Sequence, residues 1–70
     1  MTDLPKLTKR HWAAFDECVS YEAQNRIYHW RHASMYDLAA HGYVRSTIAA
    51  NIGTCYFATK SGIDARKALT

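Results

Sequence analysis

The sequence predicts an all-α protein, and three features of the chain lead to this expectation. Apolar residues recur at three- and four-residue steps over residues 12–30, which places them on one face of a helix. Gly42 and Gly53 stand where helices are expected to end, and Pro5, the only proline, precedes the first periodic residue. No segment shows the sustained period-two alternation of a strand. We therefore expect one small four-helix domain that covers residues 1–70.

The first predicted helix is long and covers residues 8–32. Thr8 suits its N-cap, because the side-chain oxygen can accept a hydrogen bond from an amide of the first turn. The apolar stripe of this helix is broader than one small core would bury, so we expect a homodimer with this helix at its interface. The stripe consists of Trp12, Phe15, Val19, Ala23, Ile27 and Trp30.

The second predicted helix begins at Ser34 and ends at Gly42. Ser34 and Asp37 have the spacing of a capping box, in which each side chain satisfies an amide at the start of the helix. Gly42 is the residue best able to take the left-handed conformation that follows a helix.

Two further helices are expected over residues 45–52 and 54–69, with Gly53 between them. Gly62 lies inside the last helix and should weaken it by about 1 kcal/mol relative to alanine. All the predicted helices except the last contribute to one core, which is expected to contain Trp12, Phe15, Val19, Ile27, Leu38, Ile48, Ala49 and Ile52.

The composition indicates a folded protein with a mild positive charge. Hydrophobic residues make up 49% of the 70 residues, and nine Lys and Arg against six Asp and Glu give a net charge of +3, which favours an anionic partner. Cys18 and Cys55 are too few for a disulfide framework and indicate a reducing compartment. With no signal-peptide pattern and no apolar run near the roughly 20 residues of a membrane span, we expect a cytoplasmic protein without a membrane segment.

One segment carries a motif with functional meaning. It contains Leu38-Ala39, Gly42-Tyr43, Ile48-Ala49, Ile52 and Gly53. This segment resembles the helix-turn-helix of DNA-binding regulators of phage, plasmid and bacterial type, and the resemblance covers about residues 38–66. It implies a helix-turn-helix within residues 34–66, in which Ala49 allows two helices to approach and Gly53 supplies the turn. The implied function is a small transcriptional regulator that binds duplex DNA.

The resemblance also implies which residues contact DNA. The fourth helix would enter the major groove, while Arg45 and Lys60 would contact phosphates. The complete DNA-binding set is expected to be Arg45, Ser46, Tyr56, Phe57, Lys60 and Ser61.

A protein-binding module is the second function that the sequence leaves open. No Arg, Asn or Gln stands in residues 55–61, where a recognition helix would read bases. The chain also holds more aromatic residues than so small a core should bury, so some are expected to serve as interface anchors. A phage- or plasmid-encoded inhibitor that docks on a host nucleic-acid-processing enzyme would have both properties, with the host protein as its partner.

Catalysis, cofactors and metals are not expected. Cys18 has no recognisable orienting group that would make it a nucleophile together with a histidine. His29 and His32 are three residues apart, but the sequence offers no nearby third metal ligand and contains neither Cys-x-x-Cys nor His-Glu-x-x-His. We therefore predict that the protein is not an enzyme, has no catalytic or metal-binding residues and needs no cofactor.

Overall fold

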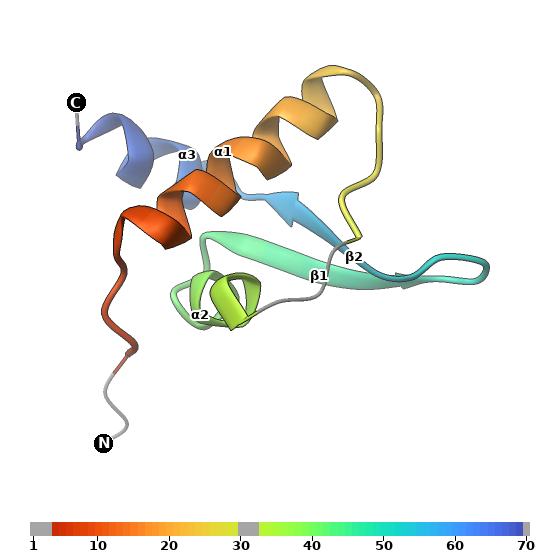
Figure 1. Ribbon diagram of the computed structural model, residues 1–70, viewed down its shortest axis with the longest axis horizontal. Helices are drawn as coiled ribbons and strands as arrows, with labels where there is room; N and C mark the ends of the chain where they lie inside the picture. The colour runs from red at the N-terminus through yellow and green to blue at the C-terminus, as the bar shows by residue number, and fades with distance from the viewer. Residues whose placement is uncertain (1–3, 30–32, 70) are drawn as a thin grey trace.

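The computed structural model describes residues 4–29 and 33–69 and shows a mixed α/β fold. Its elements are α1 (Lys9–Ala23), α2 (Ala33–Ala40), β1 (Val44–Ala49), β2 (Gly53–Ala58) and α3 (Lys60–Lys67). In Figure 1, α1 lies above the β-hairpin, α2 lies below it, and the hairpin tip projects away from the end that carries both termini. The predicted all-α class, with four helices and a helix-turn-helix, is therefore wrong.

Helix α1 is shorter than predicted because the chain leaves the helix after Ala23. Asn25 takes a left-handed conformation with φ 58°. The amide of Arg26 then donates to the carbonyl of Tyr21 at 2.8 Å, and the amide of Asn25 donates to the carbonyl of Glu22 at 3.0 Å. These bonds satisfy carbonyls of the last turn in a Schellman motif, which an asparagine can form in place of glycine.

The predicted first helix therefore covers two different structures. Its start is confirmed, because Thr8 is the N-cap of α1. Beyond α1 the chain turns back, and Tyr28 forms an isolated antiparallel bridge with Tyr56, whose amide donates to the Tyr28 carbonyl at 2.9 Å. The last part of the predicted helix, residues 30–32, lies outside the described residues, and so does His32, which was not expected to form a metal site with His29.

Helix α2 ends as predicted but does not begin as predicted. Gly42 has φ 80°, its amide donates to Ala39, and the amide of Tyr43 donates to Leu38 at 3.0 Å, which again is a Schellman motif. Ser34, however, is buried within α2, so it is not the N-cap that the sequence predicted.

The central part of the segment predicted to be the helix-turn-helix forms an antiparallel hairpin, in register from Val44 opposite Ala58 to Ala49 opposite Gly53. The amide of Ile52 donates to Ala49 at 3.3 Å and closes the turn. Gly53 has φ 93°, so the glycine predicted for a turn between helices serves a turn between strands. Strand formation is favoured by β-branched and aromatic residues, namely Val44, Thr47, Ile48, Thr54, Tyr56 and Phe57.

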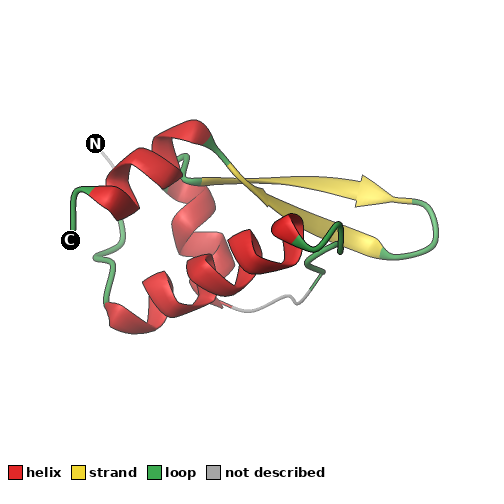
Figure 2. Cartoon of the chain, turned by 90° about the horizontal axis from the view of Figure 1, so that it is seen from above, coloured by secondary structure: helices red, strands yellow, loops and turns green. Residues whose placement is uncertain are grey.

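The core lies between α1, α2 and the base of the hairpin. Of the predicted core residues, Phe15 and Leu38 are buried in it, but Ile48 is 83% exposed, and Ile27 and Ile52 are also exposed. Ile48 is exposed because the outer half of the hairpin extends beyond the helices (Figure 2). The buried cluster consists of Phe15, Cys18, Tyr28, Met35, Leu38, Val44 and Tyr56.

Helix α3 closes the base of the hairpin. Thr59 is its N-cap, and the Thr59 hydroxyl accepts a hydrogen bond from the Gly62 amide at 3.0 Å and donates to the Gly42 carbonyl at 2.7 Å. Arg66 joins α3 to α1 through two hydrogen bonds to the Asp16 carboxylate, at 2.9 and 3.1 Å. Gly62 is buried where α3 meets α1, which makes it a packing position.

Candidate functional site

One edge of the sheet has no partner among the described residues. Strand β2 lies between β1 and the isolated bridge at Tyr28, so β1 is an edge strand. Figure 2 shows that no described element runs alongside the half of β1 that leads to the hairpin tip. An edge strand of this kind offers unpaired backbone groups to another strand.

The hydrogen-bond pattern shows which backbone groups of β1 point outward. The amide of Thr59 donates to Tyr43, so these two residues form a hydrogen-bonded pair. Hydrogen-bonded and non-hydrogen-bonded pairs alternate along an antiparallel ladder. Every second residue of β1, counted from Tyr43, is therefore bonded to β2. The backbone groups of the residues between them point away from β2. The outward positions therefore include Ser46 and Ile48. Tyr56, opposite Ser46, fits this assignment because its amide donates away from β1.

A groove lies next to this edge, between α2 and the hairpin, with a volume of about 650 Å³. Ile48 forms one side and is 83% exposed, while Tyr36 forms the other and is 58% exposed. None of the lining residues carries a charge, so the groove suits uncharged side chains. They are Tyr36, Ala39, Ser46, Thr47, Ile48, Thr54 and Tyr56.

The free edge lacks the features that normally block strand pairing. Natural edge strands are commonly protected by charged side chains, proline or a bulge. In β1 the only charged residue is Arg45, near the start of the strand, and no proline is present. Full burial of a side chain such as Ile48 is worth about 1.5–3 kcal/mol, so leaving it in water in mid-strand forgoes that stabilisation. We therefore regard the edge and groove as the candidate site.

The position of α2 at the groove is fixed by a contact with the start of α1. His11 accepts a hydrogen bond from the Thr8 amide at its Nδ1 atom, at 3.0 Å. Its Nε2 atom therefore carries the hydrogen and donates to the Asp37 carboxylate at 2.6 Å. Asp37, predicted to cap α2 with Ser34, thus connects α2 to α1 and holds the neighbouring Tyr36 at the groove.

The residues predicted to bind DNA do not share one recognition helix. Arg45 and Phe57 are cross-strand neighbours, with the guanidinium carbon 5.8 Å from the ring centroid. Ser46 is exposed on β1, opposite Tyr56, which is only 1% exposed and belongs to the core. The remaining two, Lys60 and Ser61, are exposed at the start of α3.

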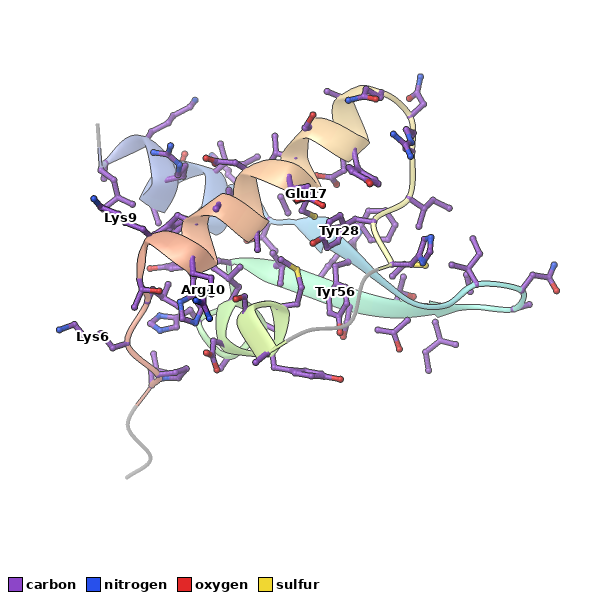
Figure 3. The ribbon with its side chains drawn as sticks, viewed as in Figure 1. Lys6, Lys9, Arg10, Glu17, Tyr28 and Tyr56 are labelled. Carbon is purple, nitrogen blue, oxygen red and sulfur yellow. The ribbon has the colours of Figure 1, made fainter. Side chains whose placement is uncertain are left out.

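The molecule also has a basic end, opposite the hairpin tip. Lys6, Lys9 and Arg10 lie at this end in Figure 3, and none of the three forms an ion pair with a described residue. The segment before α1 is held in place by His41, whose Nε2 atom donates to the Pro5 carbonyl at 2.6 Å. This end therefore presents three unneutralised cations on an ordered part of the chain.

A second hollow, with a volume of about 570 Å³, lies between this end of α1 and α3. The ion pair of Arg66 with Asp16 stands at its wall, so the cation and the carboxylate there neutralise each other. Its other lining residues are Leu7, Thr8, Lys9, Trp12, Ala13 and Leu69.

The two thiols are buried and free of disulfides. Burial, with a smaller effect of the Glu22 charge, raises the pKa of Cys18 to about 12, so this thiol is not activated as a nucleophile. Burial likewise raises the pKa of Tyr28 to about 12. Figure 3 shows Tyr28 between α1 and the hairpin, where it forms the isolated bridge with Tyr56 of β2.

Two further properties concern metals and membranes. Nowhere in residues 4–29 and 33–69 do three His, Cys, Asp or Glu side chains gather as a metal site would require. No helix in the same part of the chain has the length and apolar character to cross a membrane.

Sequence reasoning missed the groove, although it named two of its residues as DNA contacts and Ile48 as core. Tyr36 was one of the aromatic residues from which interface anchors were expected, whereas Thr54 was not expected to belong to a site. The signal that could have indicated two strands is the enrichment of β-branched and aromatic residues on both sides of the turn, namely Val44, Thr47 and Ile48 before it and Thr54, Tyr56 and Phe57 after it. Comparisons with protein-family models, with curated proteins and with solved structures found no match.

Proposed function

We propose that the protein is a protein-binding module that accepts an extended segment of another polypeptide as an additional strand on β1. The observation that carries this proposal is the free edge of β1, whose single charged residue, Arg45, lies near its start, directly beside an uncharged groove. Of the two functions that the sequence leaves open, this one does not depend on a helix-turn-helix.

Strand addition would use the backbone and the side chains of the site together. The outward amide and carbonyl groups of Ser46 and Ile48 supply main-chain hydrogen bonds, which give affinity for any extended segment. Alternate side chains of the incoming strand face the groove between Ile48 and Tyr36, and this gives specificity. Because the lining carries no charge, a charged side chain at those positions would lose its hydration without a partner. The preferred ligand is therefore a short extended segment with alternate apolar residues.

Selection from a displayed library of random octapeptides tests the proposal, with affinities then measured by fluorescence anisotropy. Selected peptides should alternate apolar residues. Ser46→Pro removes an outward amide at a position where an edge strand tolerates proline, and Ile48→Lys places a charge at the groove. Each should weaken binding at least about tenfold, the equivalent of one hydrogen bond or a partly buried side chain.

The matched control is Ile63→Lys, the same change at an exposed residue of α3, and it should bind like the original protein. Circular dichroism of all three variants checks that the fold is kept. Peptides whose affinity is unchanged in both Ser46→Pro and Ile48→Lys would place the binding site elsewhere and contradict the proposal.

A second candidate function, binding to nucleic-acid phosphates, is favoured by the basic end alone. If Lys9 and Arg10 contact phosphates, replacing each by alanine should weaken binding to all duplex sequences alike. The slope of log affinity against log salt should also fall by about 0.9 per lost contact. Electrophoretic mobility shifts at several salt concentrations provide the measurement.

The matched controls for this experiment are Arg45→Ala and Lys60→Ala, which a helix-turn-helix would require for binding. We expect both to bind duplex DNA as the original protein does. A loss of affinity confined to these two variants would exclude the basic end as the contact surface. No affinity for any duplex at low salt would remove this second candidate.

A further inference from the structure

We infer that the strand that occupies the edge of β1 is β1 of a second copy of this chain. Two copies would then form a symmetric dimer with one continuous four-stranded sheet, in the order β2, β1, β1, β2. The inference rests on the proposed function for the choice of site, and it names the partner.

The edge is complementary to itself. Two copies of β1 run antiparallel when a two-fold axis passes beside Thr47. Ser46 then lies opposite Ile48 of the second copy, and both are residues whose backbone groups point outward. The reciprocal pair forms by symmetry, giving about four new backbone hydrogen bonds without a break in the β1–β2 ladder. All three residues are exposed in the single chain, so no side chain must leave the core.

The side chains of this arrangement fill the groove. Residues opposite each other in an antiparallel pair face the same side of the sheet. Ile48 of the second copy therefore stands on the groove side, next to Ser46, facing the space bounded by Tyr36 and Ala39. The same contact is repeated in the other direction. The most exposed large apolar side chain of each copy is thus covered by the groove of the other.

The charge pattern permits the pairing. Arg45 is the one charged residue of β1, and it lies opposite Ala49 of the second copy. Two like charges therefore do not meet across the new interface, which would otherwise disfavour a symmetric pair. Arg45 also faces the side of the sheet away from the groove, where its guanidinium lies over Phe57. The groove side of the dimer remains free of charged β1 residues.

The exposed area agrees with a chain that covers part of its surface in an assembly. A monomeric protein of 8.0 kDa exposes about 4,450 Å² by the usual scaling of area with mass. This chain exposes 5037 Å². The excess of about 600 Å² means that the chain is less compact than a typical monomer of this mass. Part of it belongs to the hairpin that projects from the body in Figure 2.

This interface differs from the one that the sequence predicted. The broad apolar stripe of α1 indicated dimerisation through that helix. In the structure, Phe15 of the stripe is buried in the core, and Trp12 and Val19 pack against it. Trp12, Phe15 and Val19 are therefore covered within one chain, whereas Ile27 is 40% exposed and Ile48 is 83% exposed.

Multi-angle light scattering across micromolar concentrations tests the inference. The original protein should have twice the 8.0 kDa mass of one chain. Ile48→Lys should be monomeric, with a dissociation constant raised by about 100-fold or more, because symmetry introduces the buried charge twice. Ile63→Lys, on α3, should remain dimeric. A monomeric original protein at every concentration, or a dimer that Ile48→Lys leaves intact, overturns the inference.

Cross-linking tests the register. Thr47 would face Thr47 of the second copy in a pair without hydrogen bonds, with Cα atoms about 4.5 Å apart, which a disulfide can span. Thr47→Cys in a Cys55→Ala background should form a covalent dimer under mild oxidation. The second change is needed because Cys55 lies opposite Thr47 within the hairpin. Ser61→Cys in the same background is the control and should not cross-link. Equal cross-linking of both variants, or none in either, contradicts the register.

Failure of this inference is distinguishable from failure of the proposed function. A monomer that binds selected peptides, with losses in Ser46→Pro and Ile48→Lys, refutes the dimer and retains the function. A protein that neither dimerises through β1 nor binds a peptide there refutes both.

Discussion

Gly62→Ala is expected to lower the free energy of unfolding by about 3 kcal/mol, the upper part of the range for overpacked cores. A Cβ atom at this position would collide with the carbonyl oxygen of Tyr43 and lie 2.8 Å from Cε1 of Phe15. Both neighbours are held, one by backbone hydrogen bonds and the other by the core. The substitution would raise helix propensity by about 1 kcal/mol, but the collision outweighs this gain.

Urea denaturation followed by circular dichroism at neutral pH measures this effect. Ser61→Ala, at the neighbouring exposed position of α3, is the control and should change stability by less than about 0.5 kcal/mol. A stabilised Gly62→Ala variant would show that helix propensity dominates at this position, as the sequence alone suggested, and that α3 does not pack closely on Tyr43.

Raising the pH from 9 to 11 is expected to cost about 4 kcal/mol of stability. The pKa of Cys18 is raised from 9.0 to about 12 and that of Tyr28 from 10.0 to about 12, chiefly by burial. The folded protein therefore keeps protons that the unfolded chain releases, so this stability is present below pH 9 and is lost as the pH rises toward 12. Above its pKa in the unfolded chain, each group lowers the stability by about 1.4 kcal/mol per pH unit. Between pH 9 and 11 this loss extends over two pH units for Cys18 and one for Tyr28.

Chemical denaturation at intervals of pH checks this dependence. Cys18→Ala is the informative variant, because it should remove the slope between pH 9 and 10, where Tyr28 does not yet contribute. Cys55→Ala serves as the control for loss of a buried thiol. An unchanged slope in Cys18→Ala would show that other groups cause the alkaline loss of stability.

The candidate site shows where sequence reasoning reached its limit. Ser46 was named as a DNA contact and Ile48 as a core residue, and both belong to the groove instead. Each assignment followed from placing residues 45–52 on a helix. Strand formation depends on pairing with residues 53–58 across the turn, and the same short apolar pattern fits either structure until that pairing is known.

The sequence by itself determined several local turns and caps of the chain, but not the turn at Asn25 that ends α1. Thr8 begins α1 and Gly42 ends α2 as predicted, and Gly53 occupies a turn, because capping and positive φ depend on one residue and its immediate neighbours. Only the tertiary structure decided which residues are exposed and which segments contact each other. It placed Ile48 in water, because the outer half of the hairpin extends beyond the helices that would have covered it. It also made Gly62 a contact with another segment, because burial and strand pairing are set by residues distant in the chain.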